Sequence, residues 1–446
     1  RLPLSPNNFT FPFLLNSSAS LSLLPSGSEL HARLTKTGYT SYLPVANALV
    51  DFYGKCGQLE LAHDVFDEMA LKDTVSYNAV LGAHARLGED MRRARKVFDG
   101  MGERNVITWN AMVVGYVNAG ELGMARAVFD EMTERNVVSW SVLVMGYCKG
   151  CLLDDARELF DRMPNKNLVS WSVMITGYSQ SGRAEEAMGL FWEMERTGVA
   201  LDPATMTGVI SAAAQLGRAE LANWIGCYVD RNGIERNERV LTALVDMHAK
   251  CGNVEQALHL FDEIPYRDVF SYAALLNGLA SNGHGEKALE IFYRMRADGI
   301  KPDHITFVGV LSACSHAGLV DMGLEFWESM VRDYEIERGP DHYACVVDML
   351  SRAGRLEEAF EMAWSMPKGP HPGALGALLA GCKTYRNLEI AERIAGKLFE
   401  LEPGNTGNYI LLSSIYASKD RWEDAARVRR VMKERCSQKS PGSSWF

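Results

Sequence analysis

The stretch from Val106 to Asn136 reads VITWNAMVVGYVNAGELGMARAVFDEMTERN, and it predicts two short helices around one tight turn. Apolar residues recur at helical spacing in both halves of this stretch. Gly120 lies between the halves, where a residue that tolerates positive φ can end the first helix. Neither helix can bury its apolar stripe alone, so this hairpin needs similar hairpins beside it.

The same pattern returns along almost the whole chain. Five residues after most turn positions comes a small residue, and four residues further comes a phenylalanine in most copies. The turn positions are Gly57, Gly88, Gly120, Cys151, Gly182, Gly217, Gly252, Gly283, Gly318 and Gly354. The predicted units are 8–42, 43–73, 74–105, 106–136, 137–167, 168–202, 203–237, 238–268, 269–303, 304–339 and 340–370. Most units have 31 or 35 residues, and a fixed period in this range is typical of a solenoid.

Composition limits the class of protein. The chain has 446 residues, of which 47% are hydrophobic and 23% charged, and no apolar run approaches the ~18 residues that cross a bilayer. Nine cysteines without a disulfide-type spacing favour a reducing compartment. The net charge of −10 weighs against nucleic-acid binding, although a local basic groove can lie on an acidic protein. The first residue is Arg1, so we expect the natural N-terminus and its targeting peptide to lie outside this sequence.

Several units resemble a known family. Stretches such as VSYNAVLGAHARLG and VSWSVMITGYSQSGRAEEAMGLFWEM resemble the pentatricopeptide repeats of plant proteins. The alternation of unit lengths resembles the subclass that mixes long and short repeats. The tetratricopeptide repeat has a period of ~34 and a Trp-x-x-Leu-Gly-x-x-Tyr start that these units lack. The resemblance implies an all-α protein, an α-solenoid wound as a right-handed superhelix, with about eleven units over residues 8–370.

A different pattern begins after Met366. The sequence Pro-Lys-Gly-Pro-His-Pro-Gly predicts a boundary there. Residues 371–446 predict two more helical hairpins, and they resemble the E-type extension that follows the repeats in plant organellar RNA-editing factors. The tail from Ser440 to Phe446 resembles the end of that extension. In many relatives a cytidine-deaminase-like domain follows, and the sequence leaves open whether one followed Phe446.

Catalytic motifs are poorly matched. A zinc deaminase needs a His-x-Glu and a later Pro-Cys-x-x-Cys. His284-Gly285-Glu286 matches the first motif by letters, and the pair Cys148 and Cys151 matches part of the second, but both fall inside ordinary repeats. Phosphate-binding loops, nucleophile elbows and His-Glu-x-x-His are not found either. We therefore expect no catalytic residue, no metal site, no cofactor and no enzymatic activity.

Instead, the resemblance implies RNA recognition spread over the repeats. In this family the fifth residue of a repeat faces one base, the last residue supports it, and the second residue, usually aliphatic, wedges between successive bases. The expected fifth/last pairs are Asn47 with Asp73, Asn78 with Asn105, Asn110 with Asn136, Ser141 with Asn167, Ser172 with Asp202, Thr207 with Asn237, and Thr242 with Asp268. By the family's preferences they resemble choices for U, pyrimidine (C first), pyrimidine (C first), A, G, A and G, from 5′ to 3′. The expected wedges are Val75, Ile107, Val138 and Val169, whereas Ala204 and Arg239 depart from the aliphatic norm.

Two features of the sequence limit base readout. Ala273, Val308 and Ala344 stand at the fifth position of later units and offer no side-chain hydrogen bond, so those units should hold RNA without reading it. Asn, Ser and Asp at such places are also good helix caps. Capping explains any single pair as well as base readout does. Seven polar pairs at corresponding positions favour readout.

The function that the resemblance implies is selection of a site for C-to-U RNA editing in a mitochondrion or chloroplast. The chain would bind single-stranded organellar RNA, and residues 371–446 would dock a trans-acting cytidine deaminase of the DYW type and small accessory editing proteins. An organellar RNA-binding factor for splicing, stabilisation or translation is the first alternative. A protein-binding helical scaffold is the second, and the acidic balance of the chain favours it.

Overall fold

The computed structural model describes residues 9–435, and in this range the chain forms α-helices, one short 3-10 turn and no strand. The chain divides between Ala212 and Ala213 into two compact units, which are described separately. The division falls inside α13 (Pro203–Leu216).

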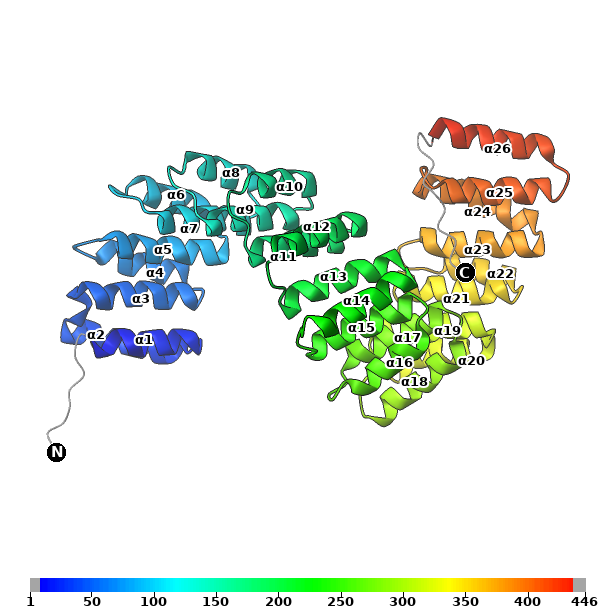
Figure 1. Cartoon of the computed structure of the whole chain (residues 1–446), viewed down its shortest axis with the longest axis horizontal. Helices are drawn as coiled ribbons and strands as arrows, with labels where there is room; N and C mark the ends of the chain where they lie inside the picture. The colour runs from blue at the N-terminus through cyan, green and yellow to red at the C-terminus, as the bar shows by residue number, and fades with distance from the viewer. Residues whose placement is uncertain (1–8, 436–446) are drawn as a thin grey trace. The chain divides into compact units, whose positions relative to one another are not determined.

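The first unit is a series of helical hairpins. Its helices before α13 are α1 (Thr10–Ser20), α2 (Leu24–Thr37), the 3-10 turn η1 (Tyr39–Ser41), α3 (Leu43–Lys55), α4 (Leu59–Glu68), α5 (Thr74–Leu87), α6 (Met91–Asp99), α7 (Val106–Asn118), α8 (Leu122–Glu131), α9 (Val137–Lys149), α10 (Leu153–Arg162), α11 (Leu168–Gln180) and α12 (Ala184–Thr197). The first helices of successive hairpins, from α1 and α3 through to α11, each contact the next (Figure 1).

The second unit repeats this arrangement. Its helices after α13 are α14 (Ala219–Arg231), α15 (Glu238–Lys250), α16 (Val254–Glu263), α17 (Val269–Ser281), α18 (Gly285–Ala297), α19 (His304–Ala317), α20 (Val320–Arg332), α21 (Pro340–Arg352), α22 (Leu356–Trp364), α23 (Pro372–Tyr385), α24 (Leu388–Leu401), α25 (Thr406–Ala417) and α26 (Trp422–Arg435). Here α15, α17, α19, α21, α23 and α25 contact one another in sequence, as Figure 1 shows in green to orange.

The last residue of most units starts the next first helix by capping it. At the start of α7, Asn105 Oδ1 accepts the N–H of Thr108 at 3.0 Å, and Thr108 Oγ1 accepts the N–H of Asn105 at 3.4 Å. This capping box satisfies donors that a helix N-terminus otherwise leaves unpaired, and such a cap stabilises the helix by about 1 kcal/mol. Equivalent boxes begin at Asp73, Asn136, Asn167, Asp268 and Asp303.

The predicted turns are confirmed. Gly120 has φ +75°, and Cys151, at the equivalent place in the next hairpin, has φ +58°. Gly278 on α17 serves a different purpose, because a Cβ there would lie 2.2 Å from the Cβ of Ala249 on α15. Adjacent first helices therefore pack too closely at this point for any larger side chain.

Aromatic pairs join several hairpins to the next. Phe129 on α8 is 2% exposed, and its ring centre lies 4.8 Å from that of Trp140 on α9 in an edge-on arrangement. The guanidinium of Arg135 lies over the same phenylalanine ring at 5.0 Å. The same edge-on pairing recurs at Phe66 with Tyr77, Phe98 with Trp109, Phe160 with Trp171, and Phe261 with Tyr272. Because removal of such a buried ring typically costs about 3–5 kcal/mol, these pairs hold neighbouring hairpins in register.

The prediction of an all-α solenoid is thus confirmed. The described residues contain no helix long and apolar enough to span a membrane. The boundary at residues 370 and 371 stays a prediction, and the tail motif from Ser440 to Phe446 lies outside the described residues.

Candidate nucleic-acid interface

One face of each first helix carries the expected recognition residues. Positions 2, 5, 9 and 13 of a first helix fall on one side, because an α-helix has 3.6 residues per turn. In α7 these positions are Ile107, Asn110, Val114 and Asn118. This side of each first helix is called the 2-5-9-13 face below.

Position 2 is apolar and exposed in most repeats. The exposed fractions are 58% for Val75, 66% for Ile107, 53% for Val138 and 55% for Val169. Phe270 and Ile305 occupy the same position and are 64% and 42% exposed. Phe270 and Ile305 are not among the expected wedges, because their repeats have Ala273 and Val308, not a polar residue, at the fifth position. Repeated exposure of large apolar side chains at one position points to a ligand surface.

In the first compact unit, the fifth residue of a repeat lies close to the last residue of the same repeat. Asn47 Nδ2 donates to Asp73 Oδ1 at 3.3 Å, and Asn110 Nδ2 donates to Asn136 Oδ1 at 3.4 Å. The third pair is linked indirectly, since Thr108 Oγ1 donates to Asn78 Oδ1 at 2.8 Å. The last residue therefore caps the next helix and orients the preceding fifth residue with the same oxygen.

Hydrogen bonds keep the carboxyl of Asp73 ionised. Partial burial alone would raise its pKa, but donors from the backbone and hydroxyl of Ser76 and from Asn47 outweigh that effect and hold the pKa below its usual value. A carboxylate that accepts three hydrogen bonds fixes the Asn47 amide in one orientation, and an amide in one orientation can discriminate between bases.

Several fifth-position atoms lack a hydrogen-bond partner. Asn47 Oδ1, Asn110 Oδ1 and Ser141 Oγ are three of the six buried side-chain polar atoms in residues 9–435 that have none. A buried unpaired polar atom costs about 1–3 kcal/mol, and a ligand could pair with these atoms only after a local rearrangement, because they have almost no exposed surface. Ser141 is the most buried of the three residues, at 8% exposed.

A surface hollow marks the 2-5-9-13 face of two adjacent repeats. It has a volume of about 240 Å³ and lies between α9 and α11. Ser172, at the fifth position, lines it together with Met145, Lys149, Thr176 and Gln180, which stand at positions 9 and 13. Ser172 is half-buried, so its side chain borders an open space rather than the core.

The remaining expected residues lie at comparable places. Asp202 Oδ1 accepts the N–H of Thr205 at 2.8 Å, while Thr207 donates its hydroxyl to the Pro203 carbonyl at 2.7 Å. Thr207 belongs to the first unit and Asn237, its expected partner, to the second. In the second unit Asn237 and Asp268 cap α15 and α17, and Thr242 is half-buried.

Several repeats carry a cation at position 13, which is not among the residues expected from the sequence. These cations lie eight positions after the fifth residue, and this spacing in the sequence would have been enough to predict them. Lys250 is 49% exposed and pairs with Asp246 at 2.8 Å, an exposed ion pair that contributes at most about 1 kcal/mol. A phosphate can therefore replace the carboxylate at little cost. The position-13 cations are Lys55, Arg86 and Lys149 in the first unit, and Lys250 and Arg352 in the second.

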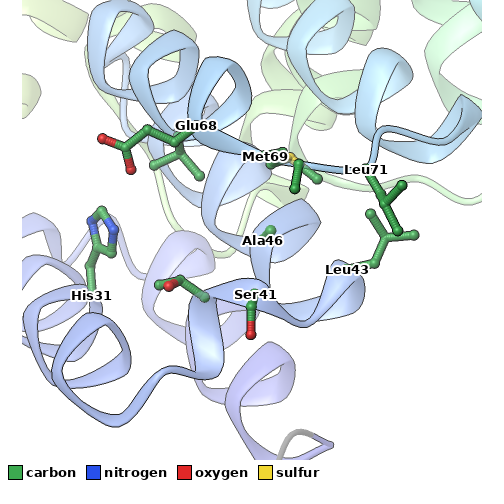
Figure 2. Close-up of a pocket in the computed structure, with 10 residues that line it drawn as sticks. His31, Ser41, Leu43, Ala46, Glu68, Met69 and Leu71 are labelled. Carbon is green, nitrogen blue, oxygen red and sulfur yellow. The ribbon is translucent and has the colours of Figure 1, made fainter.

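A second hollow lies beside the interface but shares no expected recognition residue with it. It measures about 280 Å³ at the junction of α2, η1, α3 and α4. His31 and Glu68 lie on one side of it, and Leu43 and Leu71 lie on the other (Figure 2). Leu43 and Ala46 stand at positions 1 and 4 of α3, off the 2-5-9-13 face.

The partial deaminase motifs do not form a metal site in the described residues, which contain no group of three or more His, Cys, Asp or Glu suited to a metal ion. Cys148 Sγ contacts Met174 Sδ at 3.7 Å, and burial raises the pKa of the Cys148 thiol to about 12. Cys151 and His284 occupy turns before second helices.

Stacked helical hairpins with one chemically patterned helix face define the class, an α-solenoid of recognition repeats. Comparisons with known proteins identify the family. The PPR repeat model matches residues 45–73, 75–106, 107–137, 138–168, 239–269, 305–334 and 341–368, and the PPR repeat family model matches residues 166–215 and 267–316. An E motif matches residues 385–446. The chain belongs to the pentatricopeptide repeat family and carries an E motif.

Similar plant proteins cover the whole chain. A pentatricopeptide repeat-containing protein of Arabidopsis thaliana is 43% identical over all of this chain and 74% of its own length. A putative mitochondrial member from the same plant is 38% identical over 99% of this chain and 72% of its own length. A chloroplastic member is 35% identical over all of this chain and 54% of its own length. The crystal structure of the maize pentatricopeptide repeat protein PPR10 aligns with a TM-score of 0.56 at 19% identity, over 97% of this chain and 69% of the maize chain.

Proposed function

We propose that this chain binds single-stranded RNA in a sequence-specific manner and selects a site for organellar C-to-U editing. The RNA would follow the 2-5-9-13 faces within each unit. Exposed residues at position 2 would stack between bases, and the fifth and last residues would read base edges. Cations at position 13 would contact phosphates.

The observation that carries the RNA-binding proposal is the repeated geometry at the fifth position. Asn47 and Asn110 each donate one hydrogen bond to the last residue of their repeat and keep an unpaired carbonyl oxygen. Capping accounts for Asp73 and Asn136, but it does not account for these two asparagines, which lie inside their helices. Both oxygens are covered by protein atoms, so a base edge would pair with them only after a local rearrangement of the amides.

The editing proposal rests on the E motif that follows the repeats. In this proposal a DYW-type protein supplies the deaminase in trans, together with small accessory editing proteins. Membership of the subclass that mixes long and short repeats agrees with the unit lengths of 31 and 35 residues. Relatives assigned to mitochondria and to chloroplasts support an organellar location.

Two experiments test the proposal. Sequencing of RNA that co-purifies with the chain should recover one transcript segment whose order of bases agrees with the seven fifth/last pairs. A plant without the protein should lose editing at a cytidine a few nucleotides downstream of that segment. Unchanged editing across both organellar transcriptomes would exclude the editing role.

The chain without residues 371–446 separates editing from the other RNA-related functions. An editing factor should keep its affinity for the short RNA segment read by the repeats but fail to restore editing in the null plant, because the deaminase would have no docking surface. A factor for splicing, stabilisation or translation should restore its transcript. A protein-binding scaffold should show no RNA affinity that falls with salt.

A further inference from the structure

One face of the last helix combines an exposed aromatic ring with cations. Trp422, at the start of α26, is 65% exposed. Ala426, Arg429, Arg430 and Lys433 follow on the same side of the helix at helical spacing. These five residues are called the α26 face. Together with Ala425 they line a surface groove of about 450 Å³.

The cations of this face remain available to a ligand. Arg421, which directly precedes α26, and Arg427, on α26, are both held by Asp424, the latter at 2.6 Å. Arg429 contacts only the hydroxyl of Ser413, at 3.4 Å, while Arg430 and Lys433 form no ion pair with any residue in 9–435. In a chain with a net charge of −10, a local group of unpaired cations marks a place for an anion.

We propose that the α26 face is a second RNA contact, one that binds a nucleotide outside the segment read by the repeats without regard to its base. An acidic peptide would pair with the cations, but it would leave the Trp422 ring without a planar partner. A nucleotide supplies both groups, because its base stacks on the ring and its phosphates meet Arg430 and Lys433. This inference rests on the proposed RNA-binding function.

RNA binding by the full chain tests the inference. Two probes are compared: the RNA 5′-UCCAGAG-3′, which follows the seven expected pairs, and the same RNA with about ten uridines on each side, comparable to one single-strand binding site. Trp422→Ala should weaken binding of the flanked RNA by about tenfold and leave the short RNA unaffected. The double variant Arg430→Gln/Lys433→Gln should reduce the salt dependence of flanked-RNA binding by about 1.4 in log–log slope, at about 0.7 per phosphate contact.

Arg427→Gln is the matched control, because Arg427 lies on α26 but is paired with Asp424. It should bind both RNAs as the unsubstituted chain does. Equal affinities of the Trp422→Ala variant and the parent for the flanked RNA would overturn the inference, and so would an equal loss on both probes. If the parent fails to bind even the short RNA, the proposed function itself fails, which is a different result.

A chain that ends at Arg435 completes the test. The substitutions should have the same effect in that chain as in the full one. If Arg430→Gln/Lys433→Gln no longer changes flanked-RNA binding there, the α26 face serves residues 436–446 instead of RNA, and the inference is wrong.

Discussion

Asp73 Oδ1 accepts the N–H of Ser76 at 2.8 Å and the side-chain amide of Asn47 at 3.3 Å. One oxygen thus caps α5 and fixes a residue on α3, in the preceding repeat. Capping and the proposed base readout are therefore compatible roles for one residue, because the last residue of one repeat is the cap of the next helix. The last residue of a repeat can therefore be exchanged for another residue that caps helices well, such as Asn for Asp, without destabilising the start of the next helix.

Asp73→Asn should change base preference without changing stability. Asn105 makes the same capping box at the start of α7, so the free energy of unfolding should stay within about 0.5 kcal/mol. The substituted pair would then consist of two asparagines, like Asn78 with Asn105. The preferred base at the position read by Asn47 should therefore change from U to C. Asp73→Ala should instead lose about 1 kcal/mol. Urea unfolding and competition with RNAs that carry U or C at one position measure both effects.

Asn47→Thr should move preference at the same base from U toward G. The resulting Thr/Asp pair would equal Thr242 with Asp268, which the resemblance assigns to G. A mismatch at one read position should cost about 1–3 kcal/mol, so the change is measurable by fluorescence anisotropy with four RNAs that differ at one base. Asn165→Thr, at an exposed position in a loop, is the control and should change nothing. If binding of all four RNAs falls equally in Asn47→Thr, the positional reading is wrong.

The hairpin architecture could be predicted because each hairpin repeats the same local signals. Turn positions such as Gly120 and Cys151 were located by period alone, and both have positive φ. The repeat after Gly88 is one residue longer than its neighbours, and Asp90 lies in the left-handed region directly before α6. The turn residues and the spacing of apolar residues indicate the same hairpin in every repeat, so the fold does not depend on any single signal.

The details that the sequence did not reveal depend on contacts between units. The edge-on pairing of Phe129 with Trp140 joins residues of two hairpins, and the period does not show which aromatic residues meet. The burial of Ser141 also depends on contacts between helices. A serine at this position fits the expected pattern in the sequence, and only packing in the structure removes its hydroxyl from the surface. Phe270 was missed for another reason, because its unit has Ala273 where the expected readers have a polar residue.

Phe270→Ala should weaken RNA binding by about 1–3 kcal/mol, the usual value for one stacked base. The loss should be equal for all four bases at that position, because Ala273 is buried and offers no hydrogen bond. Stability should hardly change, since Phe270 is 64% exposed. Filter binding with RNAs that differ at this nucleotide gives the measurement. Tyr266→Ala is the matched control, being an aromatic residue in the preceding loop that is 80% exposed. Equal behaviour of the two variants would contradict a stacking role.

A buried histidine pair should make the second and third hairpins sensitive to acid. His84 Nδ1 lies 2.8 Å from the carbonyl oxygen of Glu89, which only accepts, so this nitrogen carries the proton. The lone pair on His84 Nε2 can then accept from His63 Nε2 at 2.7 Å. Burial, Arg93 and the neighbouring His84 lower the pKa of His63 to about 4, against the smaller opposite effects of Asp67 and Glu60. Burial also lowers the pKa of His84, opposed by Glu89, Asp90 and Glu60.

The sign of the pH effect follows from these lowered pKa values. The unfolded chain binds a proton on His63 near pH 6.5 and the folded chain near pH 4, so stability is complete above the first value and falls as the pH drops toward the second. The loss from His63 alone should reach about 3 kcal/mol at pH 4. Hydrogen exchange at the amides of α4 and α5, corrected for its intrinsic pH dependence, measures the local opening free energy. In the His63→Gln variant this opening free energy should fall less between pH 6.5 and 4 than in the parent. His259→Gln, at an exposed histidine, should leave the fall unchanged. An identical pH profile in His63→Gln and the parent would show that the pair does not control this opening.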